Sequence, residues 1–195
     1  MVEKLEPRVA DVDVDAMFLD RWSPRSFDPP PVTEEQIATL FEAARWSPSC
    51  YNDQPWLFCY AVDSSERQRF LSALVEKNRL WAKRAPLLMF LLARKRFKRS
   101  GKPNRHAPFD AGSAWMALAL QARSLGLFAH AMAGFNVERA AKILEVDRDE
   151  FEIMAAIAVG RIGDPDLLPD DLKRIEAPNQ RKPANEVSRR YPITG

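Results

Sequence analysis

The stretch "AARWSPSCYNDQPWLF", from Ala43 to Phe58, joins the end of one predicted element to the start of another. Thr33 to Gln36 fits the S/T-x-x-E/Q capping box, and the apolar residues that follow recur at helical spacing, so Glu34 to about Arg45 is predicted to be a helix. Ser47 to Pro55 is rich in turn-forming residues, and Trp56 to Val62 has the composition of a strand. The stretch therefore predicts a helix, a loop and a strand in succession.

Downstream of this unit, helical and strand patterns continue to alternate. A second capping box, Ser65 to Gln68, is predicted to open a helix with Phe70, Leu71, Leu74 and Val75 on its inner face. "LLMFLL", Leu87 to Leu92, is a short apolar run that predicts a strand buried on both faces.

The most apolar helix follows Asp110, which is predicted to cap it, and ends at Gly126. Because it is apolar nearly all round, we expect it to lie in the core or in a subunit interface. A strand at Leu127 to Ala133 comes next.

Asn136 is predicted to cap a helix from Val137 to Glu145, and Phe151 to Gly160 forms the last predicted strand. From Asp164 onward no periodicity survives, so the tail is predicted to be disordered or to lie as an arm over another surface. Alternating helices and strands ordinarily indicate a doubly wound parallel sheet, but no strand is followed by G-x-G-x-x-G or a Walker loop.

Composition narrows the function classes. The 195 residues predict one domain, and 46% apolar with 29% charged residues is ordinary for a globular protein. The apolar runs are too short to span a bilayer, and the first residues are too acidic for a signal peptide. Two cysteines argue against a disulfide scaffold or a zinc site and favour the cytoplasm. A net charge of +2 does not indicate a nucleic-acid binder.

One local exception is the stretch from Ala93 to Pro108, which carries basic residues without an acid between them. Its cations are Arg94, Lys95, Arg96, Lys98, Arg99, Lys102 and Arg105. Such a stretch can bind nucleic acid, an anionic membrane or the phosphates of a ligand, or can simply form a solvated loop.

A second basic stretch is "DRWSPRSFDPP", Asp20 to Pro30. Its prolines disfavour a helix, and in an extended segment Arg21, Ser23 and Arg25 point to one side. Two guanidinium groups and a hydroxyl on one face suit a phosphate or carboxylate, although a solvated surface stretch has the same spacing.

Four segments, in this order, give the chain its resemblance to a known family: "RWSPRSF", "AARWSPSCYNDQPWLF", "DAGSAWMALALQARSLGLFAHAMAGFN" and "AIAVGRIG…QRKPANEV". Together they resemble the nitroreductase family of FMN-dependent oxidoreductases. The second segment is the most specific, because small-Pro-Ser-x-x-Asn-x-Gln-Pro-Trp is rare elsewhere.

This resemblance implies an α+β fold with a central mixed sheet flanked by helices, in one domain over residues 1–195. It also implies a homodimer with FMN at the interface, so that each flavin touches both chains. The apolar helix after Asp110 would then pack at the dimer core, and residues 164–195 would form an extended C-terminal arm across the partner.

The resemblance also assigns cofactor-binding residues. Arg21, Ser23 and Arg25 correspond to ligands of the FMN phosphate, with Arg181 or Lys182 as a further cationic contact. The residues implied beside the isoalloxazine ring are Pro48, Ser49, Asn52, Gln54, Ala133 and Gly134. No catalytic side chain and no metal ligand is implied, since the chemistry takes place at N5 of the flavin.

Three further residues lie outside this set of implied contacts. Trp22 and Pro24 depart from the commonest form of the first segment. His130 fits a core or interface histidine better than a ligand.

The activity implied is a ping-pong cycle in which NAD(P)H reduces FMN, and the flavin then reduces a nitroaromatic, a quinone or an enone. The alternatives are a specialised flavin enzyme, such as a dehalogenase or a dehydrogenase, and a non-catalytic flavin-binding module. The basic stretch from Arg94 to Arg105 is a hypothetical site for the 2′-phosphate of NADPH. Neither nucleic acid nor a membrane is an expected partner.

Overall fold

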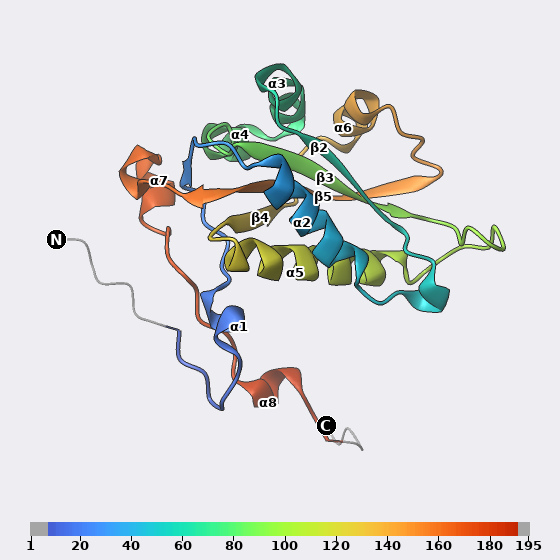
Figure 1. The fold of residues 1–195 in the computed structure, drawn as a ribbon, viewed down its shortest axis with the longest axis horizontal. Coiled ribbons are helices and arrows are strands. Elements are labelled where there is room, and N and C mark those ends of the chain that lie inside the picture. Colours follow the sequence, from blue (N-terminus) through green and yellow to red (C-terminus); the bar gives the residue numbers. More distant parts are fainter. Residues whose placement is uncertain (1–7, 191–195) are drawn as a thin grey trace.

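The computed structural model describes residues 8–190 and is built around an antiparallel sheet (Figure 1). Its path runs β1-β5-β3-β2, and β4 pairs with β5 beside that path. The strands are β1 (Phe27–Asp28), β2 (Trp56–Ala61), β3 (Leu87–Arg94), β4 (Phe128–Met132) and β5 (Phe151–Ile162).

The predicted mixed sheet is corrected by the strand directions. In residues 8–190, β1, β3 and β4 each pair with β5 in antiparallel orientation, and β2 pairs with β3 likewise. β3 and β4 run in the same direction, as strands joined by a helical crossover do, but β5 lies between them and runs opposite to both. The alternation of elements therefore does not produce a parallel pair.

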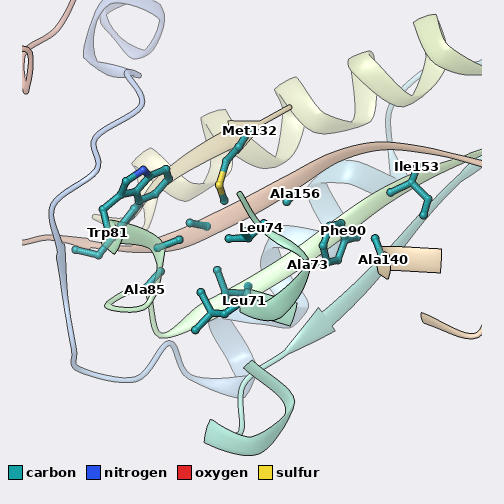
Figure 2. Packing of buried hydrophobic residues seen from close by; sticks show 14 of the residues in the cluster. Leu71, Ala73, Leu74, Trp81, Ala85, Phe90, Met132, Ala140, Ile153 and Ala156 are labelled. Carbon is teal, nitrogen blue, oxygen red and sulfur yellow. The ribbon is translucent and has the colours of Figure 1, made fainter. Parts of the chain in front are cut away.

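The predicted strand from Leu87 is central, and both of its faces are buried. Leu88, Phe90 and Leu92 face one apolar cluster, and the alternate residues from Leu87 to Ala93 face the other. Helices α3, α4 and α6 cover the first face, and α2 and α5 cover the second (Figure 1). Figure 2 shows the first cluster, which extends from Trp81 past Leu74 and Met132 to Phe90.

The described residues form eight α-helices and two short 3-10 turns. The α-helices are α1 (Ala16–Asp20), α2 (Glu34–Arg45), α3 (Ser64–Ala73), α4 (Glu76–Ala82), α5 (Ala107–Ser124), α6 (Val137–Leu144), α7 (Asp170–Lys173) and α8 (Ala184–Val187). The 3-10 turns are Cys50–Asn52 and Pro165–Leu167. None of these helices combines the length and apolarity that crossing a bilayer requires.

Two of the predicted helix caps are confirmed. Thr33 accepts a hydrogen bond from the backbone of Gln36, whose side chain bonds back to the Thr33 backbone. Asn136 caps α6 by accepting from the backbone N–H of Arg139 at 2.8 Å. Both caps satisfy backbone donors that the first helical turn leaves without partners.

The second predicted capping box is wrong. Helix α3 begins at Ser64 with Asp63 as its N-cap, and no side chain caps it, so Ser65 lies inside the helix. The helix ends after Ala73, and Val75, predicted to face inward, is exposed and starts α4 instead. The backbone of Val75 bonds to Gly134 at 3.1 Å, so a long-range contact breaks the apolar repeat.

The cap predicted for the apolar helix is also wrong. α5 begins three residues before Asp110, with His106 as its N-cap and Pro108 in its first turn. The buried Asp110 carboxylate accepts instead from the backbone N–H of Cys50, at 3.1 Å. Gly126 ends the helix region as predicted, with φ +71, a conformation that glycine adopts without strain.

After β5 the chain leaves the sheet and runs beside the N-terminal segment that contains α1 (Figure 1). Arg8 and Glu176 both bond across the two segments, and α8 lies beyond them, away from the sheet. The last five residues of the predicted arm, 191–195, lie outside the described residues.

Candidate functional site

The basic stretch from Asp20 to Pro30 adopts the predicted extended form. Side chains from Arg21 to Arg25 alternate strictly: Trp22 and Pro24 are buried, while Arg21, Ser23 and Arg25 are partly exposed. Trp22 packs edge-on against Phe128, with ring centroids 5.9 Å apart. One face of the segment is thus anchored in the core, and the polar face is presented outward.

Around Arg21 three segments bring guanidinium groups together. Arg21 donates to the Ser23 hydroxyl at 3.3 Å. Arg8 donates to the backbone carbonyls of Leu19 and Arg21, at 3.0 and 2.6 Å, and to that of Asn179 at 2.9 Å. Arg181 bonds to the Asn179 carbonyl as well, at 3.2 Å. We call Arg8, Arg21, Ser23 and Arg181 the arginine cluster.

The arginine cluster has positive charge without a matching carboxylate. Within residues 8–190, none of its arginines forms an ion pair. Burial, and then the charges of Arg8 and Arg181, lower the pKa of Arg21. Like charges held together at a half-buried position favour the binding of an anion.

Two other predicted phosphate contacts have partners of their own. Arg25 lies 3.7 Å from the buried Glu176 carboxylate, which also accepts from the backbone N–H groups of Arg25 and Ser26. Lys182 lies 3.6 Å from Glu186 and is exposed. The structure brings Arg181 to Arg21 and gives Lys182 a local partner.

His130 lies on β4 behind the basic stretch. Its Nδ1 is 2.8 Å from the carbonyl oxygen of Pro24, so Nδ1 carries the donated proton. Its ring is 4.6 Å from the Trp81 ring. Burial, with a contribution from the charges of Arg25 and Arg21, lowers the pKa of His130 to about 4 although the Pro24 hydrogen bond acts in the opposite direction. A neutral, packed histidine agrees with the core interpretation.

The loop from Pro48 to Gln54 has an unusual backbone. Tyr51, Asn52 and Gln54 have φ of 54, 54 and 49, in the left-handed region that side chains other than glycine rarely adopt. Gln54 bonds through its backbone to the Ser49 hydroxyl and through its amide to Asn52, at 3.0 Å in both cases. Strained residues clustered and braced in this way are typical of binding loops.

Within this loop the predicted residues differ in exposure. Pro48, Asn52 and Gln54 are exposed, and Ser49 is partly exposed. Gln54 also donates to the Asn52 side-chain oxygen at 3.2 Å, so the two predicted ring contacts act as one unit.

The turn after β4 holds Ala133, which is exposed, and Gly134. The Gly134 carbonyl accepts from the Asn78 amide at 3.0 Å and from the Val75 backbone, so its N–H is the group left for a ligand. A Cβ at Gly134 would lie 2.5 Å from Asn78 Nδ2 and 2.9 Å from Val75 Cγ2, so α4 requires glycine here.

These predicted residues form two groups, at opposite ends of α5. The arginine cluster, His130 and Gly134 lie along or beside β4, which ends at Met132, and the four residues from His130 to Gly134 span at most about 14 Å. The Pro48–Gln54 loop is tied to Asp110 near the start of α5, about 22 Å along the helix from Leu125. The structure therefore separates Asn52 from Arg21 within one chain.

One face of α5 is uncovered between these ends. Phe109 is 80% exposed and Met116 is 36% exposed, with the exposed Gly112 between them at helical spacing. An apolar helix face open to solvent is typical of a protein interface.

Sequence reasoning missed three residues that organise the site: Arg8, Asn78 and Glu176. Each acts on a segment far away in the chain, and Glu176 lies 151 residues from Arg25. No local motif marks them, so only the folded structure could identify them. In residues 8–190 no group of His, Cys, Asp and Glu side chains is arranged to hold a metal ion.

Comparisons with known proteins identify the family of the chain. A family model described as "Nitroreductase family" matches residues 19–161, which include the basic stretch, the Pro48–Gln54 loop, α5 and the Gly134 turn. A crystal structure described as an oxidoreductase containing FMN is 41% identical, covers 96% of both chains and superposes with a TM-score of 0.91.

Relatives known from sequence are more distant. A Streptomyces coelicolor protein named "Putative NADH dehydrogenase/NAD(P)H nitroreductase" is 29% identical over 171 residues, which cover 76% of this chain and 83% of that protein. A nitrobenzene nitroreductase of Ectopseudomonas oleovorans is 36% identical over 66 residues, 34% of this chain and 29% of that protein.

Proposed function

The chain belongs to the nitroreductase family, and from this premise we propose that it reduces flat, electron-poor acceptors such as nitroaromatics, quinones or enones. It is an oxidoreductase with FMN as its cofactor and NAD(P)H as its co-substrate. The observation that carries the proposal is the arginine cluster, whose like charges have no carboxylate partner within residues 8–190.

The cluster fits the phosphate of FMN. Arg21 supplies a planar fork of donors, and Arg181 adds a second guanidinium that reaches it from the C-terminal segment. A phosphate dianion offers several strong acceptors and offsets the burial and the repulsion that together lower the pKa of Arg21. Ser23, bonded to Arg21, adds a neutral donor. In this proposal Arg25 acts mainly through Glu176, which holds the backbone of the segment extended.

The ring of FMN would lie toward the Gly134 turn. The backbone N–H of Gly134, which donates no hydrogen bond within residues 8–190, can donate to an electron-rich edge of the ring. Asn52 carries both a donor and an acceptor, which suits the mixed edge of the pyrimidine ring.

We propose a homodimer that completes this site, because Asn52 and Arg21 lie at opposite ends of α5. If two α5 helices pack antiparallel about a two-fold axis through their exposed faces, the Asn52 loop of one chain approaches the arginine cluster of the other. Burying Phe109 and Met116 in this interface removes the exposed apolar stripe.

When bound, FMN supplies the hydride chemistry at its N5. The chain's own residues bind and orient: the arginine cluster holds the phosphate, the Gly134 N–H stabilises negative charge on the ring, and the Pro48–Gln54 loop excludes water from its edge. Among residues 8–190, we assign no side chain in this region as a dedicated general acid. Both cysteines are free thiols, which fits the proposed cytoplasmic location.

The proposal is tested by titrating the flavin-free protein with FMN and with riboflavin, which lacks the phosphate. Replacing Arg21 with Gln is expected to weaken FMN binding about 10- to 100-fold, since a hydrogen bond to a charged group contributes about 1.5–3 kcal/mol. Riboflavin affinity should not change. Lys182→Gln is the matched control, because Lys182 pairs with Glu186.

Anaerobic mixing of the FMN-loaded protein with NAD(P)H then tests the catalysis. Bleaching of the flavin and its recovery on adding a nitroaromatic support a reductase. A flavin that binds but is not bleached would instead indicate a non-catalytic flavin-binding module.

A further inference from the structure

The basic stretch that follows β3 folds as a hydrogen-bonded hairpin. Phe97 and Lys102 are joined by a backbone bond of 2.9 Å, and Arg96 and Pro103 form a bridge. We call residues 96–105 the basic hairpin.

Cations of the basic hairpin are exposed and uncompensated. Arg94 and Lys95, just before it, pair with Glu150 and Glu152. Within the described residues, none of the cations on the hairpin itself forms an ion pair. These are Arg96, Lys98, Arg99, Lys102 and Arg105. The hairpin therefore presents a positive potential toward solvent.

The position of the hairpin is fixed relative to the Pro48–Gln54 loop. The backbone N–H of Lys98 donates to the Asp53 carboxylate at 2.9 Å, and the Phe97 ring meets the Tyr51 ring edge-on with centroids 5.8 Å apart. A freely solvated loop, the alternative interpretation of this stretch, would not be held by such contacts. The two contacts place the hairpin charges next to Asn52.

Tyr51 is an aromatic ring held in solvent. It is 90% exposed, although its φ of 54 is unfavourable for a bulky side chain. Phe97 contacts the ring, but Tyr51 is so exposed that most of its surface is left for another planar group.

A hollow lies at the base of the hairpin. A cavity of about 330 Å³ is lined in part by Asn104, by Arg105, which has no ion-pair partner within residues 8–190, and by the ion pair of Lys95 and Glu152. The Asn104 side chain is buried, its oxygen accepts from the His106 backbone, and its Nδ2 has no partner in the described structure. An unpartnered amide donor beside cationic side chains favours a ligand with acceptor oxygens.

We propose that the basic hairpin, with Tyr51 and Asn104, recognises the anionic group of a planar substrate that binds at the flavin. This inference rests on the proposed function and names its substrate class: planar molecules that carry a phosphate or a carboxylate beyond the ring. The anion has two possible sources, the 2′-phosphate of NADPH and an acidic substituent on the aromatic acceptor.

The test compares the FMN-loaded wild type with the double variant Lys98→Gln, Lys102→Gln. Neither side chain makes a hydrogen bond or ion pair within residues 8–190, so the fold does not depend on them. The control is Lys83→Gln, Lys142→Gln, an equal change of charge at exposed lysines outside the hairpin.

Rapid mixing separates the two sources. One arm measures flavin reduction by NADPH and by NADH; the other measures reoxidation by para-nitrobenzoate and by its neutral analogue para-nitrobenzamide. In the arm that carries the recognised anion, we compare the substrate with the additional anionic group (NADPH or para-nitrobenzoate) with its analogue that lacks that group (NADH or para-nitrobenzamide). The ratio of their second-order rate constants should fall about tenfold in the hairpin variant. It should not change in the control, and in the wild type it should fall as salt is added.

The proposal is overturned if the protein turns over but both ratios equal those of the wild type, or if the control lowers them as much as the hairpin variant does. If neither nucleotide bleaches the flavin, the proposed function itself fails, which is a different and recognisable result.

Discussion

In the basic stretch from Asp20 to Pro30, Trp22 and Pro24 anchor the segment in the core, while the residues between them and beside them face outward. Both are buried, and both lie between side chains that face outward. Trp22 packs on Phe128, and the carbonyl of Pro24 accepts from His130. These residues depart from the commonest family form without affecting the outward face, because alternate residues of an extended chain serve different surfaces.

His130 gives this region a pH dependence. Its pKa is lowered to about 4, first by burial, so between about pH 6.5 and pH 4 the unfolded chain binds a proton that the folded chain does not. The free energy of unfolding should therefore decrease as the pH falls through this window, by up to about 3 kcal/mol. Urea unfolding of wild type and His130→Gln at pH 7 and pH 4.5 measures the difference. Equal losses in the two proteins would contradict the prediction.

At this scale the sequence predicts a shared face for Arg21, Ser23 and Arg25, because local geometry alone determines which way they point. It does not predict that Glu176 pairs with Arg25, or that Arg8 bonds beside Arg21, because both contacts depend on where distant segments fold. Arg181 was predicted with Lys182 as a pair of alternatives, and the structure brings Arg181 to the cluster.

Secondary elements were predictable where their signals were local. The Thr33 box and the Asn136 cap each use side chains within three residues, and both are present. The predicted α3 was too long, because the apolar repeat continued through Leu74 and Val75 while the backbone there turned to meet Gly134 and Phe135. Strand directions also depended on long-range pairing, since β5 enters between two strands that precede it in the chain.

The turn after β4 is held by hydrogen bonds from Val75 and Asn78, at the start of α4, to the Gly134 carbonyl. Replacing Gly134 with Ala would place a methyl group 2.5 Å from Asn78 Nδ2, so we expect a loss of about 1–3 kcal/mol of stability. Because the obstruction is the Asn78 side chain, Asn78→Ala should remove part of this penalty in the double variant. Denaturant midpoints of the two single variants and the double variant measure the coupling. Strictly additive losses would show that the Asn78 contact is not the cause.

Across the whole molecule, α5 separates the two groups of predicted residues. Asp110 ties the Asn52 loop to one end, and the arginine cluster and His130 lie toward the other, with α1 beside the helix (Figure 1). The uncovered face carrying Phe109 and Met116 runs between them. Sequence periodicity could identify α5 as a core or interface helix but not choose between them, because that choice requires knowing which of its faces the rest of the chain covers.

A composite site can be distinguished from a site within one chain by complementation. We expect Arg21→Gln and Asn52→Ala each to bind FMN weakly as pure proteins, because in each homodimer every site has lost one contact. In a mixed dimer the two losses fall in one site, and the other site receives Arg21 from one chain and Asn52 from its partner, both intact. Random reassociation makes half of the dimers mixed, so FMN capacity should recover to about one quarter of the wild-type value.

The measurement is FMN bound per chain after the two variants are mixed, briefly denatured and refolded together. Each variant refolded alone is the control, and its capacity should stay low. If both residues served the same flavin from one chain, every chain in the mixture would still carry a defect and mixing would restore nothing. Recovery thus requires that Asn52 and Arg21 of different chains meet in one site, as the proposed homodimer places them.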